Sequence, residues 1–302
     1  MKHIFIINPA AGSRDRTKEY TAAIETHCQG LDYAIHVSQG PGDCTRLAKE
    51  AAESGEEVRI YACGGDGTLN EVAAGAAGHT NAAVTVFSGG SGNDFVKLFS
   101  QPEAFRDLEK LLDCEEATFD MIRCNEDLAL NICSVGLDAR VGTDVANYKR
   151  LPLLSGFRAY AVSTVVNVIR GISEHYVVQI DDKCYDEDFT MICACNGRFY
   201  GGGFNPVPEA DPTDGLLDIL LVTKVSRLLV PKVIGKYKNG EYKNLPHLIR
   251  HFKADKVRIL CDKETPINLD GELRLGQTVE IRIAEEKLRF FYPKGLTWKV
   301  HS

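Results

Sequence analysis

The stretch Tyr61-Ala62-Cys63-Gly64-Gly65-Asp66-Gly67-Thr68-Leu69-Asn70 decides how this chain is interpreted. An apolar strand pattern runs into three glycines within four positions, and a helical pattern follows at once. Glycine lets a backbone approach a phosphate closely or adopt a positive φ, and a helix N-terminus offers free N–H groups to an anion. The carboxylate of Asp66 would repel a bare phosphate, so it indicates a cation such as Mg²⁺ between the two. We therefore predict a phosphate-binding loop; the alternative is a plain tight turn in which Asp66 caps the helix.

Two further loops of similar composition also follow strand patterns. Asn8-Pro9-Ala10-Ala11-Gly12 comes after the pattern 3–7, and Ser88-Gly89-Gly90-Ser91-Gly92-Asn93-Asp94 comes after 82–87. In open parallel sheets ligands bind outside the carboxyl ends of the strands, so the three loops are expected to converge on one phosphate-bearing ligand. Neither the Walker pattern nor Gly-x-Gly-x-x-Gly after a strand occurs, which excludes a P-loop NTPase and a Rossmann dehydrogenase.

The pattern of elements changes along the chain and predicts two domains. Strands (3–7, 33–37, 58–63, 82–87) alternate with helices (17–27, 42–53, 68–77) in the first third, which indicates a parallel sheet covered on both faces. Beyond residue 116 the sequence is rich in strands, with a hairpin over 118–134 and helices expected at 139–149, 155–170 and 227–238. We predict an α/β domain over 1–120 and a β-rich domain over 121–293, with residues 294–302 able to return to the first domain.

Composition narrows the class of protein. The 302 residues include 42 acidic and 35 basic side chains, a formal net charge of −7, which argues against a globally basic nucleic-acid binder. The ten cysteines form no Cys-x-x-Cys pair, so a clustered zinc site has no support. The apolar run at 4–7 is too short for a signal peptide, and no run is long enough to span a bilayer. A reduced, cytoplasmic protein is expected.

The motifs, taken together, resemble the diacylglycerol kinase catalytic-domain family, which includes soluble bacterial diacylglycerol and phospholipid kinases and the sphingosine and ceramide kinases. The three loops carry this resemblance, which extends over residues 2–293; Ser91 stands where the family usually has Thr, and the hydroxyl is kept. Further matches follow in family order: Asn131-x-x-x-x-Gly136-x-Asp138, Asn196-Gly197-x-x-x-Gly201-Gly202-Gly203, Asp211-x-x-Asp214-Gly215-x-Leu217-Asp218 and Leu269-Asp270-Gly271-Glu272.

The resemblance implies a fold and an activity. The expected fold is a three-layer α/β domain followed by a β-rich, sandwich-like domain, as in NAD kinases and diacylglycerol kinases. The expected activity is transfer of the γ-phosphate of ATP to a lipid hydroxyl, that of diacylglycerol or a related phospholipid, with Mg²⁺ as cofactor. The resemblance also places a hydroxyl, that of Ser38, near the nucleotide.

The acids of the chain receive roles from the same resemblance. It implies a structural Mg²⁺ near Asp211, Asp214 and the carbonyl of Leu216, although the residues alone favour a solvated acidic turn. It implies a carboxylate–water–Mg²⁺ network that includes Asp66, Asp94 and Asp120. A lipid hydroxyl must lose a proton as it attacks, and a placed carboxylate can accept it; Asp270 is the first candidate and Glu272 the second.

A basic stretch suggests contact with a membrane. Ten basic and two acidic residues between Lys224 and Arg258 give this stretch a net charge of +8, and Tyr148 to Leu154 forms a second basic and apolar patch. Such a face can dock on anionic lipid, although charge runs are often only solvated. Peripheral membrane association is therefore expected, and the chain is also compatible with a homodimer.

Two alternatives stay open at this point. An NAD kinase also carries Gly-Gly-Asp-Gly-Thr and an Asn-Glu pair, which Asn125-Glu126 would supply, but that pair is expected at a hairpin tip, a poor place for a substrate contact. A non-catalytic lipid- or nucleotide-binding regulator is the second alternative. It is disfavoured because Asp66, Asp270 and Glu272 are all present.

Overall fold

The computed structural model describes residues 1–89, 93–148 and 172–298. The chain divides into unit 1, Met1–Met121 with Ala284–Ser302, and unit 2, Ile122–Ile283. The predicted helix at 155–170 and most of the basic patch at 148–154 lie outside the described residues.

Unit 1 is built on a six-stranded sheet with the strand order β2-β1-β3-β4-β15-β5. All neighbours are parallel except β15 and β5. The strand bounds are β1 Lys2–Ile7, β2 Tyr33–Val37, β3 Val58–Gly64, β4 Ala82–Ser88, β5 Cys114–Phe119 and β15 Leu288–Pro293. The central strands are buried along nearly their whole length, which explains why β1, β3 and β4 have continuous apolar sequences and no alternation.

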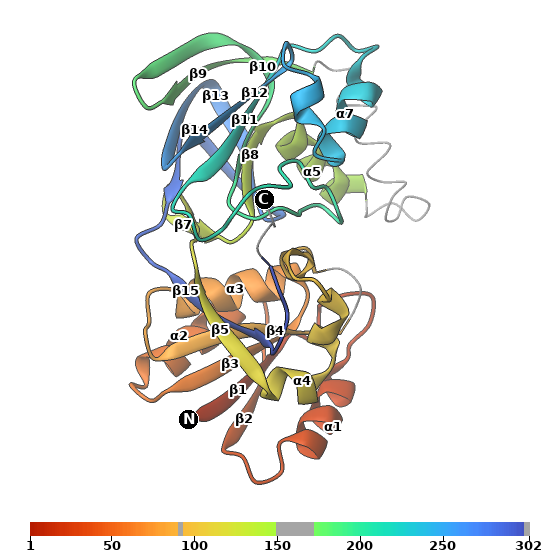
Figure 1. The fold of residues 1–302 in the computed structure, drawn as a ribbon, viewed down its shortest axis with the longest axis vertical. Helices are drawn as coiled ribbons and strands as arrows, with labels where there is room; N and C mark the ends of the chain where they lie inside the picture. Colours follow the sequence, from red (N-terminus) through yellow and green to blue (C-terminus); the bar gives the residue numbers. More distant parts are fainter. Residues whose placement is uncertain (90–92, 149–171, 299–302) are drawn as a thin grey trace. The chain divides into compact units, whose positions relative to one another are not determined.

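Helices cover both faces of this sheet. The helices are α1 Thr17–His27, α2 Asp43–Glu53, α3 Asp66–Ala76 and α4 Leu108–Leu112, with short 3₁₀ turns η1 Phe95–Leu98 and η2 Pro102–Arg106. Helix α2 packs on α3, and α1 on α4; Figure 1 shows the two pairs on opposite sides of the sheet. Gly75 makes the first packing close, because a Cβ there would lie 2.3 Å from the carbonyl oxygen of Thr45. The predicted three-layer α/β architecture is confirmed.

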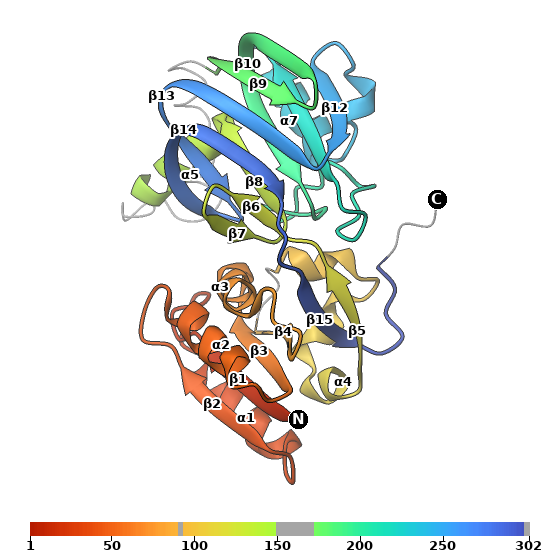
Figure 2. The ribbon, with the colours of Figure 1, turned by 90° about the vertical axis from the view of Figure 1, so that its left-hand side faces the viewer.

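The strand β15 corrects the predicted domain boundary. It lies between β4 and β5 in the sheet of unit 1 (Figure 2), whereas the sequence analysis placed it in the second domain, which was expected to end at residue 293. Phe290 and Phe291 are adjacent and both fully buried, so they face opposite layers of unit 1. The predicted single strand over 118–124 is also divided, because β5 ends at Phe119 in unit 1 and β6 begins at Ile122 in unit 2.

Unit 2 is a nine-stranded antiparallel sheet structure with the order β12-β11-β10-β8-β13-β14-β6-β7, in which β9 pairs with both β10 and β13. Its longest strands, β10, β13 and β14, extend well beyond their predicted ranges. The strand bounds are β6 Ile122–Cys124, β7 Asp127–Ala129, β8 Ile132–Gly136, β9 Glu174–Ile180, β10 Lys183–Cys195, β11 Leu217–Thr223, β12 Ile249–Ala254, β13 Lys256–Leu269 and β14 Glu272–Ile283. The expected β-rich second domain is confirmed.

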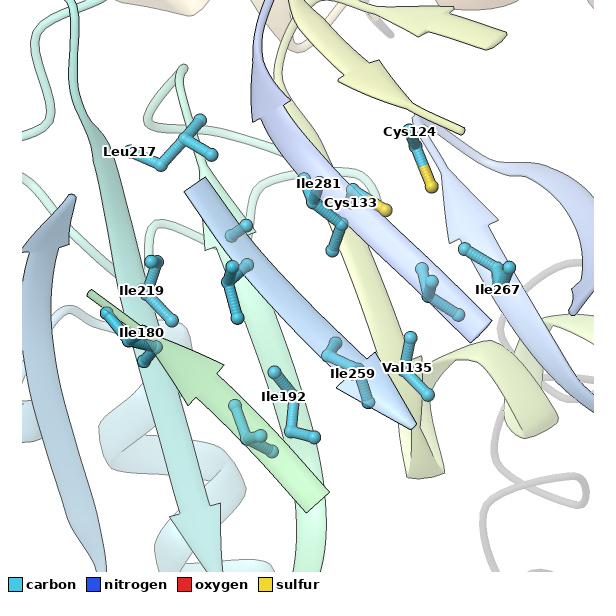
Figure 3. Packing of buried hydrophobic residues seen from close by; sticks show 14 of the residues in the cluster. Cys124, Cys133, Val135, Ile180, Ile192, Leu217, Ile219, Ile259, Ile267 and Ile281 are labelled. Atoms are coloured by element: carbon cyan, nitrogen blue, oxygen red, sulfur yellow. The ribbon is translucent and has the colours of Figure 1, made fainter. Parts of the chain in front are cut away.

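Side chains of alternate residues on these strands contribute to two different apolar cores. On β10, Ile192 and Ala194 belong to a core enclosed by the strands, shown in Figure 3, whereas Met191, Cys193 and Cys195 face a second core. The helix α7 Val230–Lys238 contributes Val230, Val233 and Tyr237 to this second core. The remaining elements are the helix α5 Leu137–Tyr148 and the turn η3 Tyr242–Asn244.

Candidate active site

The three predicted phosphate loops lie at the carboxyl ends of adjacent strands. From β1 the chain crosses to β2 at one edge, and from β3 it crosses to β4 in the opposite direction. The strand order therefore reverses between β1 and β3, and such a switch point is where open α/β sheets bind ligands. Asn8 follows β1 directly, and Gly64 is the last residue of β3.

Side-chain hydrogen bonds join these loops to one another. The Asn8 Nδ2 donates to Thr68 Oγ1 at 3.1 Å, and Asn8 Oδ1 accepts the Ala10 N–H at 3.0 Å. The Asp94 N–H donates to Asp66 Oδ1 at 2.6 Å, which ties the loop after β4 to the start of α3. The loops beginning at Asn8, Gly64 and Ser88 are therefore brought together as predicted from their positions, although Ser91 and Gly92 lie outside the described residues.

Close packing explains the first glycine of the central loop. A Cβ on Gly64 would lie 2.2 Å from Thr68 Oγ1, so only glycine fits there. Gly65 has an extended backbone with φ −113°, so the positive φ considered for this loop is not found at this residue. A Cβ on Gly67 would meet nothing within 4 Å, which leaves open space beside the N-terminus of α3. Gly12 has a φ of +83° and is the residue of the first loop that requires glycine.

Unused polar groups at these loops fit a polar ligand. Among the described residues, Asn70 Oδ1 and Asn93 Nδ2 are buried and have no hydrogen-bond partner. Buried polar atoms without partners are rare in proteins and call for a ligand or water. Helix α3 begins after Gly65 without a side-chain cap, so its first N–H groups remain available to an anion. Ser38 is buried, and its N–H donates to the Ile7 carbonyl at 2.8 Å, which fixes it beside the end of β1.

The three acids assigned to a magnesium network have other partners in unit 1. Asp94 Oδ1 accepts Lys97 Nζ at 2.5 Å, and Asp120 pairs with Lys287. In the described part of the chain no three His, Cys, Asp or Glu side chains form a group that could hold a metal ion. Asp66, at the helix start, fits a cation held between itself and a phosphate, whereas a magnesium role for all three acids stays a prediction.

In unit 2 a tight turn at the tip of the β13–β14 hairpin holds Asp270. Leu269 pairs with Glu272, so the loop has two residues, and Asp270 and Gly271 have φ values of 48° and 95°. Positive φ at both positions is the hairpin geometry that an Asp-Gly pair favours. The predicted turn is therefore present, and it points its aspartate at the segment before β8.

The carboxylate of Asp270 is held by backbone donors. It accepts the N–H groups of Leu130 at 2.6 Å, Asn131 at 3.0 Å and Ile132 at 2.8 Å, and its own N–H donates to the Ile132 carbonyl at 3.1 Å. Glu272 has a side chain that is 60% exposed, with Arg274 4.0 Å away. The two candidate bases therefore differ: Asp270 is fixed in orientation by backbone donors, and Glu272 is exposed to water.

At the predicted structural metal site, the ammonium group of a lysine already binds one of the acids. Asp211 Oδ1 accepts the Thr213 N–H at 3.1 Å, and Asp214 Oδ1 accepts the Leu216 N–H at 3.0 Å, so both acids belong to one turn. Lys253 Nζ lies 2.8 Å from Asp214 Oδ2. Burial lowers the pKa of Lys253, but the bond to Asp214 and the charge of Asp218 outweigh this and raise it. The oxygen donors suit Mg²⁺, and a metal at Asp214 Oδ2 would have to displace the lysine.

An apolar cavity with one carboxylate in its wall lies in unit 2. Leu137, Asp138, Val141, Thr190, Met191, Tyr200, Phe204, Val222, Val233, Ile234 and Tyr237 line this cavity of about 60 Å³. Ser134 Oγ and Asn268 Nδ2 both donate to Asp138 Oδ2, at 2.7 and 2.9 Å. Burial raises the pKa of the Asp138 carboxyl, an effect that these two hydrogen bonds oppose.

Asn268 connects this cavity to the turn of Asp270. Its Nδ2 binds Asp138, and its Oδ1 accepts the Gly271 N–H at 2.8 Å. Asp138 was expected only as part of a motif, and Asn268 was not among the expected site residues. An acid two residues after a buried strand was a usable signal for Asp138, whereas Asn268 and the lysine partners of the acids had none.

The comparisons with known proteins agree with this arrangement. Residues 2–124 match the model of the diacylglycerol kinase catalytic domain, and residues 131–292 match that of the YegS C-terminal NAD kinase beta sandwich-like domain. The chain is 28% identical over 270 residues to "Putative lipid kinase SAR0780" of Staphylococcus aureus (strain MRSA252), covering 88% of this chain and 87% of the relative. The relative from strain JH9, "Putative lipid kinase SaurJH9_0749", is 27% identical over the same shares.

Solved structures share the fold. A crystal structure titled "putative diacylglycerol kinase from Bacillus anthracis str. Sterne" aligns with a TM-score of 0.74 at 24% identity, covering 97% of this chain and 98% of that one. A second structure with a similar title, from the same organism, has a TM-score of 0.71 at 23% identity and covers 96% and 97%. The fold and these loops define a kinase of the two-domain type. The chain belongs to the diacylglycerol kinase and YegS family of lipid kinases.

The NAD kinase alternative loses its specific support. Asn125 has a φ of 50° at the predicted tip between β6 and β7, and its side chain binds β14, accepting the Glu280 N–H at 3.0 Å and donating to the Thr278 carbonyl at 3.3 Å. The Asn125 side-chain amide therefore binds the β6–β7 hairpin to β14. None of the described helices is long and apolar enough to cross a membrane.

Proposed function

We propose that this protein is an ATP-dependent lipid kinase that transfers the γ-phosphate of ATP to the hydroxyl of diacylglycerol or of a related phospholipid. The observation that carries the lipid acceptor is the apolar cavity of unit 2, whose wall contains the Asp138 carboxyl. Largely apolar walls with a few polar groups suit a long-chain alcohol, because the apolar part contacts the chain and a polar group orients the hydroxyl end.

Unit 1 supplies the nucleotide-binding residues in this proposal. The N–H groups at the start of α3 face the phosphates, Asn8 and Thr68 fix the loops, and the buried amides of Asn70 and Asn93 bind polar atoms of the nucleotide. Bound Mg²⁺ would neutralise phosphate charge, with Asp66 as its first protein ligand. Lys97 and Lys287, beside Asp94 and Asp120, add positive charge to the same unit.

Unit 2 supplies the proton acceptor. As the lipid oxygen forms its bond to the γ-phosphorus, the bond to the β,γ-bridging oxygen breaks and ADP leaves, and the hydroxyl proton passes to a carboxylate. Asp270 fits this role better than Glu272, because phosphoryl transfer demands orientation more than strong basicity, and three backbone N–H groups orient Asp270.

The test is incubation of the protein with γ-labelled ATP, Mg²⁺ and a total lipid extract, followed by identification of the labelled lipid. A parallel reaction with NAD as acceptor serves as control. Label in phosphatidic acid or another phospholipid supports the proposal, and label in NADP, or in no acceptor at all, contradicts it. Peripheral contact with an anionic membrane is part of the proposal, and vesicle binding tests it separately.

A further inference from the structure

The connection between β11 and α7 exposes leucines beside cations. Leu228 is 93% exposed and Leu229 is 42% exposed, whereas Val225 and Val230 on either side of them are buried. Exposing a large side chain so completely is unfavourable in water, and contiguous exposed apolar side chains mark a surface that meets another apolar phase. We call residues 226–232 the leucine tip.

Positive charge surrounds these leucines and is not neutralised within the described residues. Arg227 and Lys232 are exposed and form no ion pair there. Lys238, Lys256 and Arg258 likewise form no ion pair in the described part of the chain, whereas the five other basic residues of the stretch have acidic partners. Asp188 pairs with Lys224, Glu241 with Lys236, Glu209 with Lys243, Glu187 with Arg250 and Asp214 with Lys253. Half of the cations expected to form a broad basic face are therefore neutralised, and Arg227 and Lys232 are the unpaired ones within the leucine tip.

The tip continues into the wall of the apolar cavity. Helix α7 begins at Val230, and its inward residues Val233, Ile234 and Tyr237 line the cavity that also contains Asp138. A surface that holds the tip would thus bring its lipids next to the helix that encloses the cavity. This continuity favours a lipid surface over a protein partner as the occupant.

We propose that the leucine tip inserts Leu228 and Leu229 into the headgroup–acyl boundary of an anionic bilayer, while Arg227 and Lys232 bind lipid phosphates. Apolar insertion together with cationic contacts is the usual basis of interfacial binding. The proposal names the membrane-contacting residues of the lipid kinase proposed above and rests on that function for its biological sense. The binding itself requires neither ATP nor turnover.

The test measures binding of the full chain, without ATP, to vesicles of equal parts phosphatidylglycerol and phosphatidylcholine by flotation. We expect Leu228→Asn to weaken partitioning about tenfold, because most of one leucine leaves the apolar phase. The matched control is Leu275→Asn on β14, where Leu275 is 63% exposed; α7 and β14 lie on opposite sides of unit 2 (Figure 1). This control should bind as the parent does.

Charge is tested by a second pair of variants. Arg227→Gln with Lys232→Gln should weaken binding about thirtyfold at low salt and flatten its dependence on salt. The control is Lys256→Gln with Arg258→Gln, two exposed cations on β13. A Leu228→Trp variant gives an independent signal, since its emission should move to shorter wavelength only with anionic vesicles.

Unchanged vesicle binding by Leu228→Asn overturns the proposal, as does an equal loss in both members of a pair. If Leu228→Asn instead alters the molecular mass in light scattering while vesicle binding persists, the tip joins two copies of the chain, and the proposal is wrong. Lipid phosphorylation in detergent micelles distinguishes the two claims. If the unsubstituted protein is inactive in micelles, the kinase proposal is contradicted. The vesicle-binding result does not depend on that outcome.

Discussion

Replacing Asp270 by asparagine separates the catalytic role of this residue from its structural role. Leu130 N–H binds one carboxylate oxygen and Ile132 N–H binds the other. An asparagine can offer an oxygen to only one of these donors, and its own NH₂ must face the other. The turn itself is unaffected, because Asn-Gly favours the same positive φ values as Asp-Gly.

The expected cost follows from these contacts. One charge-assisted hydrogen bond is lost, worth about 1.5–3 kcal/mol, and a partly buried N–H is left without an acceptor, at about 1–3 kcal/mol. We expect Asp270→Asn to lower the free energy of unfolding by roughly 2–5 kcal/mol, and the Tm of unit 2 by about 10 °C. Glu272→Gln should change either quantity little, because the Glu272 side chain is 60% exposed.

Activity is then measured at a temperature at which circular dichroism shows Asp270→Asn to be folded. If Asp270 accepts the hydroxyl proton, kcat falls about 10²–10⁴-fold, the KM for ATP is retained, and the acidic limb of the pH profile disappears. A stable and active Asp270→Asn would refute both the hydrogen-bond reasoning and the catalytic role. An unstable variant with parental kcat would leave Asp270 a purely structural residue, and a large loss in Glu272→Gln alone would reverse the assignments.

Three further variants test other parts of the reasoning. Gly64→Ala should lower both the Tm and the affinity for ATP, because its Cβ would lie 2.2 Å from Thr68 Oγ1. Gly67→Ala should keep the Tm and still weaken ATP binding, because its Cβ fills open space beside the loop. Equal ATP affinities of the parent and Gly67→Ala in a titration would contradict the phosphate loop. Asp138→Asn should be more stable than the parent at neutral pH. The pKa of the Asp138 carboxyl is raised in the folded protein, so its contribution to stability is present below the ordinary aspartate pKa of about 3.9 and is lost as pH rises through the higher folded value. A difference in Tm between parent and Asp138→Asn that stays constant from pH 4 to pH 8 would contradict this. Lys253→Met should increase the rise in Tm that Mg²⁺ produces, because it removes the cation 2.8 Å from Asp214; no difference from the parent in a magnesium titration would argue against a metal at this turn.

Sequence patterns predicted the parts of the fold that depend on local order. The strands β1, β3 and β4 and the glycines after β3 could be located because a strand, a tight loop and a helix follow one another directly in the chain. The pairing of β15 could not, because no local pattern says which sheet a strand joins. The adjacent buried Phe290 and Phe291 were a sign of a strand covered on both faces, which fits the sheet of unit 1 and not a strand with one solvated face.

The site shows the same division. The Asp-Gly turn at Asp270 was predictable, since two-residue hairpins need that chemistry. Its binding to the backbone before β8 was not, because those residues are far away in sequence and the donors are N–H groups that every residue carries. Ion pairs were equally hidden: a count of basic residues between Lys224 and Arg258 predicted a broad cationic face, and five of those cations turned out to have acidic partners.

The partners of the acids indicate which of them are available for chemistry. Lysines lie against Asp94, Asp120 and Asp214, so these carboxylates are already balanced by charges of the protein itself. Asp270 accepts three backbone N–H groups, which fix the orientation of its carboxylate. Asp138, among the described residues, has only the hydroxyl of Ser134 and the amide of Asn268, within an apolar wall. Because Asn268 also binds the Gly271 N–H, a continuous chain of hydrogen bonds joins the carboxyl in the cavity wall to the turn that carries the proposed base.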